Sequence, residues 1–196
     1  MATKDRNSGE NPAYSHSPRP ASMPVSFQLR GRQLIVDRLG SQQPVPLDQI
    51  EEVRLTFEPR SFAQKLFRTR LRLKTGNTLS LHSVNFRSMV FADRQEEAYT
   101  AFIRVLLART AKANPKARFV IGRSPVVWAI LCIATAGILG AIAFFIWFAW
   151  NEGETTAALI GAFIGAAGIW QLGPIVQLNK PRTFNPEAPP QELLSG

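Results

Sequence analysis

The sequence predicts an α+β protein, in which a small antiparallel β-sheet domain with a C-terminal helix precedes a transmembrane hairpin of two helices. Residues 25–81 alternate apolar and polar side chains, and residues 93–113 repeat apolar side chains at helical spacing. Between Arg123 and Lys180 the only charged residues are Glu152 and Glu154. They separate two apolar runs, each long enough to cross about 30 Å of hydrocarbon as a helix at about 1.5 Å per residue.

Composition divides the chain further. The first 24 residues are polar and rich in Ser, Pro and Asn, and they contain no apolar stretch of the length that a secretory signal needs. We therefore expect a disordered tail in which Tyr14 and His16 are exposed to solvent. The predicted segments are a tail at 1–24, a soluble domain at 25–113, a basic linker at 114–124, transmembrane helices at 125–150 and 157–179, and a second tail at 180–196.

The soluble domain begins with three predicted strands. Phe27 and Leu29 alternate with polar neighbours, and Leu34 and Val36 do the same after a turn at Gly31. In the third strand, Ile50, Val53, Leu55 and Phe57 supply the buried face, and Glu52, Arg54, Thr56 and Glu58 supply the exposed face. Residues 59–67 are less regular and are interpreted as a loop or a bent edge.

A predicted β-hairpin follows, and basic side chains occupy every second position of its first strand. Alternation places these cations on one face and the intervening leucines on the other. They are Arg68, Arg70, Arg72 and Lys74.

The turn at Gly76-Asn77 leaves two registers for this hairpin. A two-residue loop pairs Thr75 with Thr78, whereas a three-residue loop pairs Thr75 with Leu79 and Leu73 with Leu81. We favour the second, because a slip of one residue would bury the wrong face. It sets Arg72 opposite His82 and Lys74 opposite Ser80.

Residues 93–113 are typical of an amphipathic helix that caps the apolar side of a sheet. Asp93 is the predicted N-cap, with Glu96 at the spacing of a capping box. The predicted buried face consists of Tyr99, Phe102, Ile103, Leu106 and Leu107.

The run VPLDQIEEV at 45–53, the hairpin Leu71–Leu81 and the helix with Tyr99, Phe102 and Leu106 together resemble bacterial pleckstrin-homology-like domains. The resemblance covers residues 25–113. It implies a half-open β-barrel or sandwich that a C-terminal helix closes, commonly fused to paired membrane helices, and it implies a binding or assembly module rather than an enzyme. The phosphoinositide signature of the eukaryotic relatives is not matched, so no lipid site is carried over.

Charge predicts the orientation of the transmembrane hairpin. No acidic residue lies between Ala98 and Asn151, and five cations lie within about 15 residues of the first apolar run. The loop between the two runs is acidic, and Lys180 and Arg182 follow the second run. The positive-inside rule therefore predicts that both termini lie in the cytoplasm and the acidic loop outside. Together with this orientation, the resemblance to bacterial domains implies a bacterial inner-membrane protein.

The second helix is the less hydrophobic one. Residues 159–178 contain nine Val, Ile, Leu or Phe residues, against 12 in residues 126–148. Small residues that let helices approach closely form a stripe on each helix. The predicted packing residues are Gly161, Gly165 and Gly168 in the second helix and Gly140 in the first. Either the two stripes pack against each other within one chain, or one of them serves a homo-oligomer or a larger membrane complex.

The sequence shows no signature of catalysis, cofactor binding or metal binding. Its two histidines, single Cys132 and lack of a Gly-rich phosphate loop predict no enzyme, no cofactor and no metal site. Residues 25–124 carry 18 Lys and Arg against 8 Asp and Glu, so this segment holds +10 of charge beside the membrane. No nucleic-acid motif accompanies that charge, which favours anionic headgroups as the partner.

Two functions remain open. In the first, the domain binds or assembles partners at the cytoplasmic face, where the basic strand face either meets anionic headgroups or an acidic protein or is simply solvated and discourages edge pairing. In the second, the chain is an accessory subunit of a larger membrane complex, whose essential contacts are made by the Gly-rich second transmembrane helix.

Overall fold

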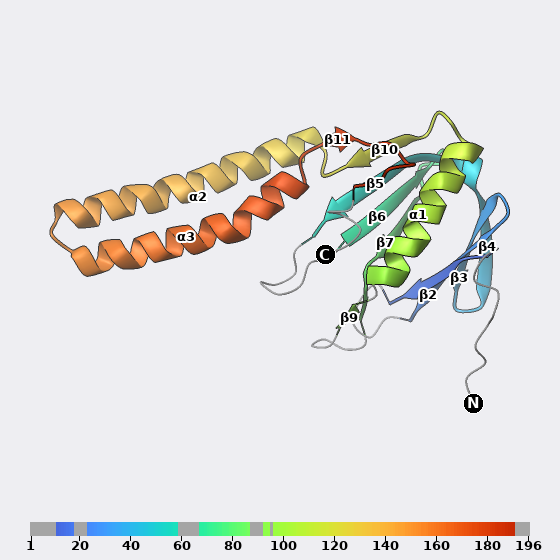
Figure 1. Cartoon of the computed structure of the whole chain (residues 1–196), viewed down its shortest axis with the longest axis horizontal. Helices are drawn as coiled ribbons and strands as arrows, with labels where there is room; N and C mark the ends of the chain where they lie inside the picture. Colours follow the sequence, from blue (N-terminus) through green and yellow to red (C-terminus); the bar gives the residue numbers. More distant parts are fainter. Residues whose placement is uncertain (1–10, 18–22, 59–66, 87–91, 95, 191–196) are drawn as a thin grey trace.

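A computed structural model describes residues 11–17, 23–58, 67–86, 92–94 and 96–190. It confirms the α+β class: two sheets rich in antiparallel pairs, which do not form a closed barrel, precede two long apolar helices (Figure 1). The predicted loop at 59–67 lies largely outside the described residues, and Phe67 already belongs to a strand.

The first sheet has four antiparallel strands in the order β1-β2-β3-β4. A tight turn at Leu39-Gly40, with both φ angles positive, joins β3 to β4. The strands are β1 (Ala13–His16), β2 (Val25–Arg30), β3 (Gln33–Arg38) and β4 (Ser41–Pro46).

Strand β1 corrects the prediction that residues 1–24 form a disordered tail. Tyr14 and His16 are 4% and 1% exposed, not open to solvent. The Tyr14 ring packs against Tyr99 and Phe102, and its hydroxyl donates to the His82 carbonyl. The prediction of a tail relied on the average composition of residues 1–24, which does not show that Tyr14 and His16 alternate with small residues in a short strand.

The second sheet has the order β11-β10-β5-β6-β7, and a short two-stranded sheet follows β7. Strand β10 runs parallel to β5, and the other pairs are antiparallel. A 3-10 turn at Leu47–Gln49 leads into β5. The bounds are β5 (Ile50–Phe57), β6 (Phe67–Leu73), β7 (Thr78–His82), β8 (Val84–Phe86), β9 (Ala92–Arg94), β10 (Arg118–Ile121) and β11 (Arg182–Thr183).

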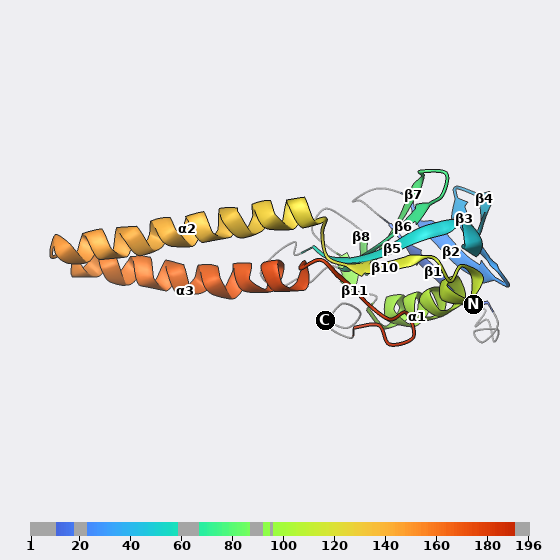
Figure 2. The same ribbon diagram turned by 90° about the horizontal axis from the view of Figure 1, so that it is seen from above.

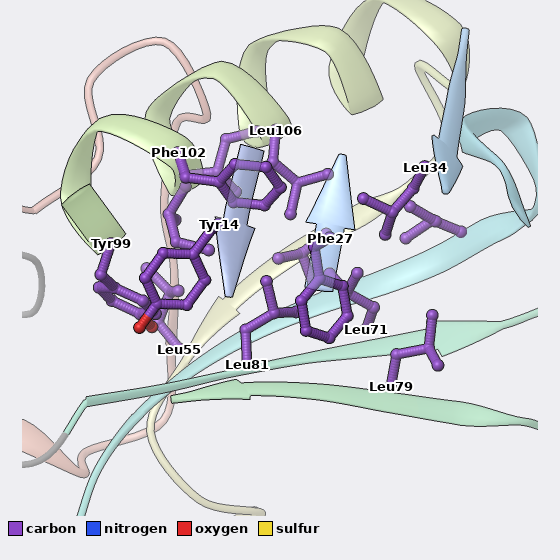
Figure 3. Packing of buried hydrophobic residues seen from close by; sticks show 14 of the residues in the cluster. Tyr14, Phe27, Leu34, Leu55, Leu71, Leu79, Leu81, Tyr99, Phe102 and Leu106 are labelled. Atoms are coloured by element: carbon purple, nitrogen blue, oxygen red, sulfur yellow. The ribbon is translucent and has the colours of Figure 1, made fainter. Parts of the chain in front are cut away.

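Helix α1 (Glu96–Ala113) lies against one face of this second sheet (Figures 1 and 2). All five side chains predicted for its apolar face are buried, which confirms that prediction. Figure 3 shows Tyr99, Phe102 and Leu106 pointing from α1 into the core. The predicted N-cap is wrong, because Asp93 pairs with Asn85 in the β8–β9 ladder instead of opening the helix.

The predicted register of the β6–β7 hairpin is also wrong. Arg70 lies opposite Ser80, and Leu71 lies opposite Leu79, so the connection is longer than the three residues expected. Leu73 N–H donates to the Asn77 carbonyl within the turn, and Lys74 N–H donates to the Gln49 carbonyl. These bonds end the strand before Lys74, yet the shift preserves the face on which each side chain lies.

The segments at 114–124 and 180–196 are not simply a linker and a tail. Strand β10 joins the second sheet beside β5, and β11 pairs with β10. Phe119 and Ile121 are buried, and the Phe184 ring packs edge-on against Phe119. A pair of alternating apolar residues was sufficient to form a strand here because β5 offered a free edge.

Helices α2 (Pro125–Asn151) and α3 (Thr155–Leu178) closely match the predicted transmembrane spans. Both are long and apolar enough to span a membrane. They extend from the domain as a side-by-side hairpin (Figures 1 and 2). Ser124 caps the N-terminus of α2 by accepting from Val127 N–H.

Candidate functional site

The hairpin joins the second sheet through Asn179, which follows α3 directly. The Asn179 side chain is fully buried, and its amide nitrogen donates to the Phe57 carbonyl at 2.8 Å and to the Ile175 carbonyl at 3.0 Å. Its amide oxygen accepts from Phe57 N–H at 3.3 Å. One side chain therefore completes the end of β5 and the last turn of α3 together.

Gly122 allows the backbone before α2 to approach the backbone after α3 closely at the same junction. It has a φ of +80°, and a Cβ there would lie 2.6 Å from the Asn179 carbonyl carbon and 2.7 Å from the Lys180 oxygen. The backbone continues the contact on both sides, because Gly122 N–H donates to the Leu55 carbonyl and Arg123 N–H donates to the Asn179 carbonyl. Only glycine fits this position.

A third contact links the two helices at the junction end. Trp128 donates its indole N–H to the Val176 carbonyl at 3.0 Å. Val176 lies in the last turn of α3, where carbonyls lack partners within the helix. Trp128 thus has a defined role in holding the base of the hairpin.

The face of the second sheet opposite α1, called here the outer face, carries three of the four predicted cations. Arg68 pairs with Glu58 at 2.9 Å, and Arg72 lies 3.3 Å from Glu51. Arg70 lies opposite Arg54 in the β5–β6 ladder.

Lys74, the fourth predicted cation, is not part of this group. It is exposed in the β6–β7 turn, beyond the end of β6. From Arg68 to Lys74 the chain advances six residues, about 20 Å at the rise of a strand. The predicted row of four cations therefore consists of three arginines on the outer face and one lysine that is distant from the α2–α3 hairpin.

Two arginines that sequence reasoning did not single out complete the outer face. Arg54 bridges Glu52 at 3.0 Å and donates to the Gly122 carbonyl at 3.1 Å. Arg123 had been assigned to the linker. Arg54 was already on the predicted exposed face of its strand, so pairing that strand with residues 68–74 would have placed it beside the basic row.

Glu52 is a buried carboxylate among these arginines. It is 8% exposed and lies within 4 Å of Arg54, Arg72 and Arg118. A β-bulge between Ile50 and Glu52 interrupts the alternation, so Arg72 reaches both Glu51 and Glu52. A bulge of this kind brings two adjacent side chains within reach of one partner residue.

An open pocket of about 350 Å³ lies between the outer face and the first turn of α2. Burial lowers the pKa of Arg70, and the neighbouring charge of Arg68 and, more weakly, of Arg54 and Arg123 lowers it further, while Glu58 raises it. The pocket is lined by Glu52, Arg54, Thr56, Glu58, Arg70, Arg72, Thr78, Arg123, Ser124 and Val127.

The predicted helix-packing residues fall into two groups. A Cβ on Gly161 would lie 2.9 Å from Ile146, one on Gly165 would lie 3.3 Å from Ile142, and one on Gly168 would lie 3.8 Å from Leu139. These three glycines therefore face α2 of the same chain. A Cβ on Gly140 would meet nothing within 4 Å, so Gly140 does not face α3.

Within the described part of the chain, no group of three or more His, Cys, Asp or Glu side chains is arranged to hold a metal ion. No protein-family model matches the chain, and comparisons with curated proteins and with solved structures gave no match.

Proposed function

We propose that the chain is a bacterial inner-membrane protein that holds a pleckstrin-homology-like binding or assembly module at the cytoplasmic face in a fixed orientation. The charges flanking the two apolar helices support this orientation. Cations precede α2 and follow α3, and the loop between the helices carries Glu152 and Glu154. With both termini in the cytoplasm, the β-domain lies at the inner leaflet.

The observation that carries the proposal is the junction at Asn179. A module on a flexible tether would meet the hairpin through one mobile segment. Here β10 leads directly into α2, α3 leads directly into β11, and Asn179 joins α3 to β5. The hairpin therefore sets which surface of the module lies at the bilayer.

A binding or assembly role agrees with the chemistry of that surface. The pocket at the base of the hairpin is lined by arginines and carboxylates, and most of these pair with each other. We infer that this basic end meets an anionic partner at the inner leaflet. Two sheets packed with a single helix are compatible with the pleckstrin-homology-like resemblance of residues 25–113.

Single-cysteine labelling of intact cells tests the orientation. In a Cys132→Ser background, Glu154→Cys in the hairpin loop and Asn77→Cys in the β6–β7 turn place one thiol at each end of the molecule. A maleimide that cannot cross the inner membrane should label the first variant directly and the second only after permeabilisation. Labelling of the Asn77→Cys variant in intact cells would reject the proposal.

A second candidate, the accessory subunit of a membrane complex, is favoured by one observation. Gly140 and the small residues that share its face lie exposed on α2, whereas Gly161, Gly165 and Gly168 of α3 face α2 of the same chain. If another membrane helix packs on that face, Gly140→Leu should reduce the size of the complex on a native gel. An unchanged size would remove this candidate.

A further inference from the structure

Positive charge is concentrated at the end of the outer face next to the hairpin. Arg54 and Arg70 are direct cross-strand partners, and Arg68 and Arg123 are close enough to lower the pKa of Arg70. Like charges directly opposite each other destabilise a pair of strands. An anion between them would convert this repulsion into attraction, so the arrangement suits a bound anion.

Not all of this charge is neutralised by the protein. Arg54, Arg68 and Arg72 have carboxylate partners, but Arg70 and Arg123 have no ion pair with any residue that the structure describes. The Nε atoms of Arg68 and Arg72 are buried, and each lacks a hydrogen-bond partner. N–H donors thus remain free on both sides of Arg70 along β6.

The pocket also includes the start of α2. Ser124 and Val127 line it, and the N-terminus of a helix of 27 residues adds partial positive charge. At about 1.5 Å per residue, α2 is about 40 Å long, close to the thickness of a bilayer with its headgroups. When α2 spans the membrane, its first turn therefore lies at the depth of the lipid phosphates.

Lys74 lies apart from the two arginines that lack an ion pair. It follows Arg70 by four residues, about 13 Å at the rise of a strand, which exceeds the Debye length of about 10 Å. A ligand held between Arg70 and Arg123 would therefore respond less to Lys74 than to Arg70. The two positions therefore provide a matched pair for experiment.

We propose that this pocket binds the phosphate group of one anionic phospholipid of the inner leaflet, with Arg70 and Arg123 as its charged donors. The inference rests on the membrane orientation proposed above. A guanidinium fork matches two phosphate oxygens, and the surrounding positive charge disfavours a headgroup that carries its own ammonium. A soluble phosphate ester offers the same group, but it lacks the acyl chains that would hold it at this depth.

Native mass spectrometry of the full-length protein in a mild nonionic detergent tests the proposal. The probes are dioleoylphosphatidylglycerol, dioleoylphosphatidylcholine and glycerol 3-phosphate. The wild-type chain should retain one phosphatidylglycerol with at least about a tenfold preference over phosphatidylcholine. Arg70→Gln and Arg123→Gln should each weaken retention about tenfold, whereas Lys74→Gln, with the same change of charge, should not.

Three results would overturn the inference. Equal losses in Lys74→Gln and Arg70→Gln would indicate diffuse attraction without a site. Equal retention of the two lipids would exclude selection of the anionic headgroup, and displacement by glycerol 3-phosphate at lipid-like concentrations would assign the pocket to a soluble ester. Thermal unfolding of each variant checks that its fold is intact. If lipid retention fails while cysteine labelling still gives the expected orientation, the proposed function survives and this inference does not.

Discussion

The junction at Asn179 and the outer face of the same sheet differ in how many of their polar groups have hydrogen-bond partners. At the junction, the Phe57 N–H and carbonyl and the Ile175 carbonyl all bond to the amide of Asn179. On the outer face, a few residues away, guanidinium donors stay unpaired among the described residues. The closed region fixes the orientation of the domain, and the open region remains available to a ligand.

The largest effect is expected from breaking the closed region. Gly122→Ala would push a Cβ into the Asn179 and Lys180 backbone at a φ of +80°. Because backbone atoms cannot move aside cheaply, we expect a loss of several kcal/mol of stability. Thermal unfolding in detergent measures it. Gly31→Ala, also at positive φ but with open space around it, is the control and should cost only about 1 kcal/mol. Equal losses would refute the tight junction.

Removing the Asn179 amide should be the next most severe change. Asn179→Ala leaves the buried N–H and carbonyl of Phe57 without their partner, which costs about 2–4 kcal/mol. We expect amide hydrogen exchange to rise at the end of β5 and at β10, while the outer part of the hairpin stays protected. Unchanged exchange at Phe57 would show that the junction does not depend on this side chain.

Within the hairpin, Gly161→Leu should separate α3 from α2. A Cβ at this position already lies 2.9 Å from Ile146, and overpacking typically costs about 1–3 kcal/mol. Gly140→Leu, which meets open space, should leave the unfolding temperature almost unchanged. A comparable loss in both variants would mean that general hydrophobicity, and not close packing of α2 and α3, determines stability.

A histidine pair, in which His16 is buried and His82 is half-buried, should make the β1 region sensitive to acid. His16 stacks on Phe27 and lies 5.4 Å from His82, and both imidazole pKa values fall from 6.5 to about 4, mainly through burial. His16 and His82 repel each other when charged, and Arg68 and Arg70 also lower the pKa of His82, while Glu58 raises it.

Since the unfolded chain takes up these protons first, stability is complete above pH 6.5 and declines as the pH falls toward 4. For His16 the loss at pH 5 is about 2 kcal/mol. Thermal unfolding at pH 7.5 and pH 5 measures it, and His16→Phe should weaken the dependence without abolishing it, because the pKa of His82 is lowered as well. A wild-type profile that is flat over this range would contradict the burial of the pair.

The smallest expected effect lies far from the junction. Leu39 has a φ of +59° in the two-residue turn between β3 and β4, and it is 73% exposed. Leu39→Asn creates the Asn-Gly pair that such turns prefer, so it should stabilise the domain by about 0.5–1 kcal/mol. Leu39→Val, which tolerates positive φ poorly, is the control and should destabilise it.

The sequence predicted what depends on local pattern. The apolar face of α1, the buried positions of β5 and the extent of both long helices follow from periodicity alone, and the structure agrees with each. It did not predict β1, β10 or β11, because two to four residues carry too little pattern and acquire structure only from a neighbouring edge.

The candidate pocket was only half predictable. Alternation correctly placed Arg68, Arg70 and Arg72 on one face, but it also included Lys74. The strand ends before Lys74 because the Lys74 N–H donates to the Gln49 carbonyl, and the local sequence gives no sign of this hydrogen bond. Arg54 and Arg123 join the pocket through strand pairing and through the entry to α2. Both are contacts between distant parts of the chain.

The pairing of β10 with β11 has a consequence for biogenesis. These neighbouring antiparallel strands flank α2 and α3, so the whole membrane hairpin is, in topological terms, an insertion within a β-hairpin. The last strand can join the sheet only after the second helix has returned to the side from which the first one left. The sheet is therefore complete only when both helices have inserted correctly. In a chain whose second helix fails to insert, β10 would keep an unpaired edge that cellular quality control can recognise.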